Sequence, residues 1–348
     1  MSNSPFVSQP LVSVIVPVFN ASATLEGSVH SLTSQTLQEL EIILVDDGSS
    51  DGSLEKIHDL ARSDARIKSL EIDSNVGVHE ARSAALKCAT GQWIGFLDAD
   101  DRARPMMFEV LYRAGESSGA SMVICGANLV APSGEIIAPK VHFTHDACIE
   151  KHIFERFCRL EFRTGSLWNK LYRRELICKY GTIPFRWRQN TNEDLLVNIG
   201  CFLDADVVQI IASNLYDYVQ RGDSVTQTTK PAAAFTQLLR AYALAVELFA
   251  DRGEEVLLLI DQLYQHQLAH ACYHIGAASD LIDLTPEVKE AMIILAIYRP
   301  ITWASMANRG LWRSTARCVS FNEQWRDWKV NSKQLIKCLL RALQRQFQ

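Results

Sequence analysis

Apolar and polar positions alternate in blocks over the first third of the chain. Five short runs are apolar almost throughout, and segments with apolar residues three or four positions apart lie between them. The strand-like runs are VSVIV, EIILV, IKSLEI, WIGFL and SMVIC, and the helical segments include Thr24–Gln35, Asp51–Ser63 and Val78–Ala89. Strands without alternation suit a mainly parallel sheet that helices cover on both faces. The pattern predicts a Rossmann-like α/β fold over residues 11–130.

The pattern changes twice farther along the chain. Residues 131–227 are less regular and contain the helix-like NEDLLVNIGCFL and the strand-like VVQII, whereas long helical runs follow Lys230–Pro231. We therefore expect an N-terminal tail (1–10) and an α/β domain (11–227) with halves 11–130 and 131–227. A smaller α-helical C-terminal region (228–348) follows.

Composition narrows the class of protein. The 348 residues are 48% hydrophobic and carry a net charge of −5, so no global positive field favours nucleic acid as a partner. The nine cysteines form no CxxC pair, and several lie in apolar runs, which indicates reduced, buried thiols in a cytoplasmic protein. The N-terminus lacks the pattern of a signal peptide, and no apolar run approaches the roughly 18 residues of a membrane span.

Polar residues follow three of the predicted strands, where ligands of α/β sheets bind. The first strand ends in Pro17-Val18-Phe19-Asn20, the second in DDGSSDG and the fourth in Asp98-Ala99-Asp100-Asp101. DDGSSDG on its own is also good turn chemistry, with Asp51 available to cap a helix. Neighbouring carboxylates such as Asp98 and Asp100 repel one another, which favours a bound hard divalent cation whose remaining ligands are phosphate oxygens.

Seven stretches in order resemble the family 2 glycosyltransferases, which have the GT-A fold. They are VSVIVPVFN, EIILVDDGSSDGS, NVGVHEARSAAL, WIGFLDADD, WNKLYRREL, NEDLLVNIGCF and YDYVQRGDSVT, and they span residues 11–227. The resemblance implies transfer of a sugar from a nucleotide diphosphate sugar, most often a UDP-sugar, to an acceptor hydroxyl with inversion. A saccharide or lipid-linked acceptor in surface polysaccharide or lipopolysaccharide synthesis is the family's usual substrate.

The resemblance also implies roles for individual residues. Asp98 and Asp100 would bind the divalent cation, and Asp194, beside Glu193, would be the general base. Residues expected to contact the donor nucleotide are Pro17, Phe19, Asn20, Asp46, Asp47, Arg82, Asp98 and Ala99. Residues expected to contact the acceptor or the donor sugar are Asp101, Trp168, Asn169 and Lys170. Ser83 and Arg102 depart from the family pattern, and the QxxRW motif of processive members is absent, which favours transfer of a single sugar.

The acidic residues fit two other protein classes less well. A response-regulator receiver has its acid pair after the first strand of the domain, whereas a complete strand and helix precede Asp46 here. A dehalogenase-type phosphatase requires Thr or Val where this chain has Arg102. Two alternatives outside enzymology stay open: a non-catalytic sensor of nucleotide sugars, and a scaffold whose tail recruits partners to a membrane.

Three further features have both a functional and a structural interpretation. His266, His270 and His274 share one face of a predicted helix, but no motif completes a metal site. Residues 331–348 combine an apolar stripe with Lys333, Lys337, Arg341 and Arg345, which is typical of a helix that lies on an anionic membrane or packs on the domain. The sequence FLDAD occurs twice, and in its second copy, Phe202–Asp206, Asp204 and Asp206 are predicted to form the turn between a helix and a strand.

Overall fold

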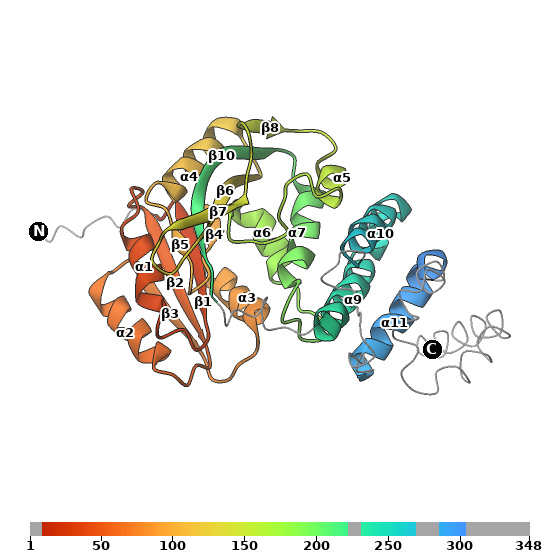
Figure 1. Ribbon diagram of the computed structural model, residues 1–348, viewed down its shortest axis with the longest axis horizontal. Coiled ribbons are helices and arrows are strands. Elements are labelled where there is room, and N and C mark those ends of the chain that lie inside the picture. The colour runs from red at the N-terminus through yellow and green to blue at the C-terminus, as the bar shows by residue number, and fades with distance from the viewer. Residues whose placement is uncertain (1–8, 222–230, 269–284, 304–348) are drawn as a thin grey trace, which may run out of the picture.

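A ten-stranded sheet flanked by helices forms the body of the protein (Figure 1). The computed structural model describes residues 9–221, 231–268 and 285–303. The strand order is β3-β2-β1-β4-β9-β6-β10-β5, with β7 beside β6 and β8 beside β10. The strands are β1 (Val12–Val18), β2 (Leu40–Asp47), β3 (Ile67–Ile72), β4 (Trp93–Phe96), β5 (Arg102–Ala103), β6 (Met122–Val130), β7 (Ile136–Val141), β8 (Ala147–Ile149), β9 (Lys170–Arg173) and β10 (Val208–Val219).

The N-terminal half of the sheet is parallel, as the apolar runs predict. Strand β1 pairs in parallel with both β2 and β4, and β2 pairs in parallel with β3. All eight residues of β2 are buried, which explains why its sequence is apolar without alternation. Since these strands point the same way, their carboxyl ends meet at one edge. The helices between the strands are α1 (Leu25–Thr33), α2 (Ser53–Ser63), α3 (Val78–Cys88) and α4 (Met107–Ser118).

Strand β9 joins the two halves and was not predicted. It lies between β4 and β6 and is antiparallel to both. Only four residues long, it carries Lys170 and Arg173 at its ends, so no apolar run marks it. Strand β10 extends well beyond VVQII and runs parallel to β6. The two predicted halves therefore form one continuous sheet, and the boundary predicted near residue 228 lies outside the described residues.

The DDGSSDG loop after β2 is fixed by its backbone and by one carboxylate. Gly48 has φ +70°, and a Cβ there would approach the backbone nitrogen of Asn75 to 2.7 Å. The Asp51 carboxylate accepts hydrogen bonds from the backbone N–H of Ser53 (3.1 Å) and of Ser22 (3.0 Å). It thus satisfies the first turn of α2 and ties that turn to the loop after β1.

Three C-terminal helices, α9, α10 and α11, stand beyond α6 and α7, at the end of the molecule away from α2 (Figure 1). Tyr242 of α9 stacks on Tyr264 of α10 with ring centroids 4.9 Å apart. Arg299 and Asp261 form a buried ion pair at 2.7 Å. None of the described helices is long and apolar enough to cross a membrane. The remaining helices are α5 (Ile153–Cys158), α6 (Arg174–Gly181), α7 (Glu193–Asp204), α9 (Pro231–Leu248), η1 (Ala250–Arg252), α10 (Glu254–Leu268) and α11 (Pro286–Tyr298).

The second FLDAD ends α7 with its residues 202–204, so the turn prediction holds for Asp206 but not for Asp204. Asp204 is the last residue of α7 and forms ion pairs with Lys179 of α6 and Arg252 of η1. Asp206 is exposed in the turn that follows. In the histidine set only His266 falls within the described residues, because His270 and His274 lie outside them. The segment 331–348 also lies outside them.

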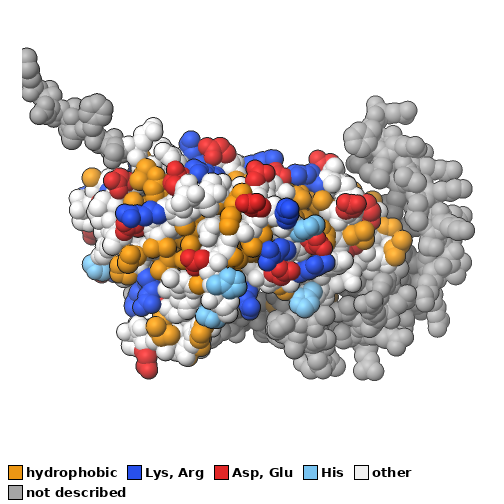
Figure 2. All heavy atoms as spheres, turned by 90° about the horizontal axis from the view of Figure 1, so that it is seen from above, with side chains coloured by type: hydrophobic (Ala, Val, Ile, Leu, Met, Phe, Trp, Pro, Cys, Tyr) orange, Lys and Arg blue, Asp and Glu red, His pale blue; other side chains and the backbone are white. Residues whose placement is uncertain are grey.

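The visible surface charges are mixed in sign, as the small net charge suggests, and the described cysteines are free thiols. On the face seen in Figure 2, acidic and basic side chains are interspersed, without a large area of one sign. The six described cysteines are all free thiols. Cys125, Cys158 and Cys201 are buried, whereas Cys88 and Cys148 are exposed. The expectation of buried thiols therefore holds for only part of the described set.

Candidate active site

A cleft of about 980 Å³ opens at the carboxyl ends of β1, β2 and β4. Parallel strands place their following loops at one edge, which explains why residues distant in sequence share this cleft. The far wall comes from the loop before β9 and from the start of α7. Among the residues expected from the sequence, those that line it are Pro17, Phe19, Asp47, Arg82, Asp98, Trp168, Glu193 and Asp194.

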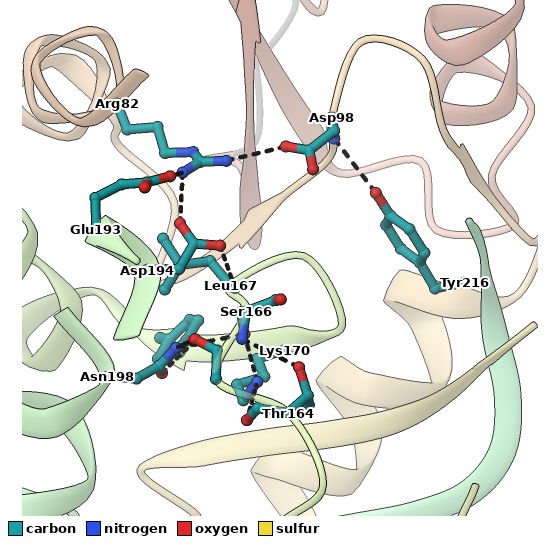
Figure 3. Close-up of polar contacts among 12 residues, drawn as sticks. Arg82, Asp98, Thr164, Ser166, Leu167, Lys170, Glu193, Asp194, Asn198 and Tyr216 are labelled. Atoms are coloured by element: carbon teal, nitrogen blue, oxygen red, sulfur yellow. Dashed lines mark hydrogen bonds and ion pairs between the residues drawn. The ribbon is translucent and has the colours of Figure 1, made fainter. Parts of the chain in front are cut away.

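The Arg82 guanidinium links the two walls of the cleft (Figure 3). Its Nη2 donates to Asp98 Oδ1 at 2.9 Å. Its Nη1 donates to Asp194 Oδ1 at 2.6 Å and more weakly to Glu193 Oε1 at 3.3 Å. The side chain is only 6% exposed, so these charges interact through protein with little screening by water. Arg82 thus holds the aspartate after β4 and the aspartate at the start of α7 in a fixed relation.

The charges in this network perturb one another. Burial raises the pKa of Asp98 to about 6; the Arg82 charge lowers it, and Asp194 and Asp100 raise it. Burial and the Asp194 charge raise the pKa of Glu193 to about 8, with Arg82 acting in the opposite sense. Burial alone would lower the pKa of Arg82, but its three carboxylate neighbours hold it above the usual value. Titratable groups so displaced within a cleft are typical of functional sites.

Asp194 is oriented by hydrogen bonds to both carboxylate oxygens. Oδ1 accepts from Arg82, and Oδ2 accepts from the backbone N–H of Leu167 at 3.0 Å. Asp194 is also the second residue of α7, where the exposed N–H groups of the first turn favour a negative charge. The side chain is 17% exposed and lines the cleft. A carboxylate that is oriented and accessible in this way can accept a proton from a bound hydroxyl.

The opposite end of the cleft combines an exposed aromatic ring with a backbone-bound carboxylate. Phe19 is 49% exposed, unusual for a phenylalanine, and its ring is available for stacking. Asp47 accepts from the backbone N–H of Val76 (2.7 Å) and of Gly77 (2.9 Å), so it shapes the loop before α3. A planar heterocycle could stack on Phe19 beside this loop.

Four other expected residues are near the cleft without lining it. Asn20 Oδ1 accepts from the Ser50 N–H at 2.9 Å, which joins the loops after β1 and β2. Asp46 is buried; its Oδ2 accepts from Ser49 N–H at 3.0 Å, and its Oδ1 has no hydrogen-bond partner among the described residues. Ala99 is buried, whereas Asp100 is partly exposed next to Asp98.

Asp101 does not have the position expected of a sugar contact. It is 1% exposed, and its carboxylate accepts from Tyr216 Oη at 2.7 Å and from Val219 N–H at 2.8 Å. It therefore joins the loop after β4 to the end of β10. Proximity in sequence to Asp98 suggested the cleft, but the intervening turn directs this side chain into the protein.

Trp168 lines the cleft, but the next two residues, Asn169 and Lys170, do not, although the sequence analysis expected all three to contact a sugar. Both are fully buried. Asn169 Nδ2 donates to the Cys125 carbonyl at 2.7 Å, and Lys170 Nζ donates to backbone carbonyls of the preceding loop. Burial lowers the pKa of Lys170 to about 7, and the Asp194 charge opposes that shift. Neither side chain can reach a sugar in this arrangement.

Comparison with known proteins identifies the family. The family model described as glycosyl transferase family 2 matches residues 13–181. EpsJ of Bacillus subtilis, an uncharacterized glycosyltransferase, is 32% identical over 255 residues, which cover 70% of this chain and 71% of EpsJ. This chain belongs to glycosyltransferase family 2. The cholesterol galactosyltransferase of Borreliella burgdorferi is also 32% identical to this glycosyltransferase, over 62% of each chain, so less than two thirds of that relative is spanned.

Solved structures support the fold of this glycosyltransferase. TarS 1-349 from S. aureus has a TM-score of 0.60 at 18% identity, covering 84% of this chain and 82% of that chain. TarS 1-349 is also known in complex with UDP and with UDP-GlcNAc, in both cases with a TM-score of 0.59 and 20% identity. At such identity the similarity demonstrates the GT-A fold, with a helical region after it.

Family 2 glycosyltransferases of the GT-A fold generally use a divalent cation, and the donor set of this enzyme fits one. Among the described residues, no group of three or more His, Cys, Asp or Glu side chains could hold a metal on its own. Asp98 and Asp100 would provide oxygen ligands; burial first, and then the charges of Asp194 and Asp100, raise the pKa of Asp98 to about 6. This suits Mg²⁺ or Mn²⁺ arriving with a diphosphate that supplies the remaining ligands.

Three cleft residues of the glycosyltransferase escaped the sequence analysis. Arg188 Nη1 donates to the Asn75 carbonyl at 2.9 Å and so joins the loop before α7 to the loop before α3. Lys140 Nζ lies 3.7 Å from the ring centroid of Tyr218. Arg188 precedes α7, and Lys140 lies on β7, both in the irregular half of the domain and outside the family-like stretches, so no sequence signal marks them. Tyr218, on β10, lies within YDYVQRGDSVT but was not singled out.

Proposed function

We propose that this glycosyltransferase transfers one sugar from a UDP-sugar to a hydroxyl of a saccharide or lipid-linked acceptor, with inversion. The proposed setting is the synthesis of cell-surface polysaccharide or lipopolysaccharide. The observation that carries the proposal is the Arg82 bridge, which places Asp98 and Asp194 in one cleft. The UDP complexes of TarS support the choice of nucleotide by similarity of fold.

The proposed reaction is a single displacement. The acceptor oxygen forms a bond to the anomeric carbon while the bond from that carbon to the diphosphate oxygen breaks. The acceptor proton passes to Asp194, and the nucleoside diphosphate leaves with the bonding electrons. Asp194 keeps its orientation through Arg82 and Leu167 N–H, so its remaining lone pairs can face the hydroxyl.

The other residues bind the donor in this proposal. Phe19 stacks on the base, with Pro17, Asn20, Asp46 and Asp47 around the nucleoside. Asp98 and Asp100 hold a divalent cation, Mn²⁺ or Mg²⁺, which supplies positive charge to the departing diphosphate. Glu193 and Arg82 keep Asp98 and Asp194 in place, and Trp168 contacts the acceptor or the donor sugar.

A donor screen tests the proposal. The protein is incubated with a panel of UDP-, GDP-, CDP- and dTDP-sugars, with and without Mn²⁺ or Mg²⁺, and release of the nucleoside diphosphate is measured. We expect cation-dependent release from a UDP-sugar, increased by an acceptor saccharide. Binding of a UDP-sugar without any release would favour the sensor alternative, and the absence of both binding and release would favour the scaffold alternative.

We also propose that residues 331–348 attach the enzyme peripherally to the inner face of the cytoplasmic membrane. The support is their pattern of Lys333, Lys337, Arg341 and Arg345 beside an apolar stripe. Binding of the full chain to anionic vesicles is expected to fall at least about tenfold when these four residues become glutamine, and to weaken with salt. Equal cosedimentation of both proteins with vesicles would show that the segment packs elsewhere.

A further inference from the structure

The loop 164–167 forms part of the cleft wall and contacts the proposed base. It lies between α5 and β9, and Gly165 and Ser166 line the cleft. At its end, the backbone N–H of Leu167 donates to Asp194 Oδ2 (Figure 3). The direction of that N–H depends on the conformation of the loop, because consecutive peptide groups are rigid planes. Whatever fixes the loop therefore also fixes one of the two hydrogen bonds to Asp194.

Lys170 lies beneath this loop with all of its ammonium hydrogens engaged. Its Nζ donates to the Ser166 carbonyl, to the Thr164 carbonyl at 3.5 Å and to Asn169 Oδ1 at 3.1 Å. The side chain is fully buried, and no described carboxylate forms an ion pair with it. Three acceptors match the three N–H groups of an ammonium ion. A buried charge held only by neutral groups is costly to the fold, so packing alone does not account for it.

Asn198 holds the same loop from the helix that carries the base. Its Nδ2 donates to the Gly165 carbonyl at 2.7 Å and to the Ser166 carbonyl at 3.3 Å. Its Oδ1 accepts from the Tyr172 hydroxyl at 2.8 Å. Asn198 is four residues after Asp194 on α7, so the two side chains share a face of that helix. Two fully buried side chains, from β9 and from α7, thus turn the loop carbonyls away from the cleft.

We propose that Lys170 is a positioning residue for Asp194. Its Nζ holds the carbonyls of Thr164 and Ser166 so that the Leu167 N–H points at the carboxylate. The inference rests on the proposed role of Asp194 as the base. It assigns the orientation of the proposed base to a buried lysine that does not line the cleft.

The substitution Lys170→Met tests this, since methionine is unbranched and close in length but carries no N–H groups. We expect kcat to fall about tenfold to hundredfold, because a misplaced base loses the near-attack geometry. The dissociation constant for UDP with Mn²⁺ is expected to change less than about twofold, since donor contacts lie on the other wall. Lys179→Met on the exposed face of α6 is the matched control, and its kcat should equal that of the wild type.

A double variant separates positioning from general damage. If Lys170 acts through Asp194, Lys170→Met should reduce residual transfer by less than about twofold in an Asp194→Asn background, because coupled residues are not additive. Full additivity would overturn the proposal, as would wild-type kcat in Lys170→Met or a parallel loss of UDP binding. An active Asp194→Asn protein would instead overturn the proposed function.

Asn198→Ala provides the same test if Lys170→Met does not fold. It removes the hydrogen bonds from Asn198 to the carbonyls of Gly165 and Ser166 without removing a charge. We expect a fall in kcat of about fivefold to twentyfold, with UDP binding retained and the same lack of additivity with Asp194→Asn. A wild-type kcat in Asn198→Ala would overturn the proposal that the loop 164–167 positions Asp194.

Discussion

Replacement of Asp194 by asparagine is expected to lower kcat by about 10²- to 10⁴-fold, the usual contribution of a general base. Asparagine has the same shape and can still accept a hydrogen bond from Arg82 or from Leu167 N–H, which are the two contacts seen here. It cannot take a proton near neutral pH. Binding of UDP with Mn²⁺ should persist, because the proposed donor and cation contacts lie on the other wall of the cleft. Transfer kinetics and calorimetric titration with UDP measure the two quantities.

The matched control for this variant is Asp206→Asn, which makes the same change in the exposed turn after α7. Its kcat and UDP affinity should equal those of the wild type. Transfer by Asp194→Asn at more than about a tenth of the wild-type rate would remove Asp194 from the role of base. In that case Glu193, the neighbouring carboxylate, becomes the residue to test.

Replacement of Arg82 by methionine is expected to reduce the free energy of unfolding by about 3–5 kcal/mol, the usual effect of removing one partner of a buried ion pair. Asp98, Glu193 and Asp194 would lose the one cation that all three contact. Transfer should also fall below detection, since both cleft walls lose their fixed relation. Urea unfolding in the presence of EDTA, together with a transfer assay, checks both effects.

The stability defect of Arg82→Met should depend on pH. In the folded protein the pKa of Asp98 is raised to about 6 and that of Glu193 to about 8, above the values of unfolded carboxyls. The folded state therefore binds these protons more tightly, and its stability falls as pH rises through these values. Without Arg82 the ionised forms of Asp98 and Glu193 destabilise the folded state further. The loss of unfolding free energy in Arg82→Met should therefore be larger at about pH 8 than at about pH 5.5. An equal loss of stability at both pH values would contradict the charge explanation.

The substitution Arg82→Lys keeps one charge but cannot bridge both walls. Its free energy of unfolding should lie between those of the wild type and of Arg82→Met.

The sequence predicted the parallel half of the sheet because burial on both faces leaves a clear mark, as in the uniformly apolar β2. It did not predict β9, whose Lys170 is buried through hydrogen bonds rather than through apolar character. The cleft lies at the sheet edge where the sequence analysis expected the site. Motifs could not show that Arg82 pairs with residues 16, 111 and 112 positions away, because such pairing depends on tertiary packing. For the same reason Asp101 was assigned to the cleft when it faces the interior.

The ion pairs of Asp204 show how the helical region is attached to the sheet. Through Lys179 and Arg252, one carboxylate connects α6, α7 and η1. Arg186 adds further pairs with Glu247 of α9 and Glu290 of α11. Apolar residues from β1 to α11 belong to one continuous core. A chain cut within residues 222–230 would therefore expose half of a shared interior instead of releasing two independent domains, and the catalytic fold and its helical extension must be exchanged or redesigned together.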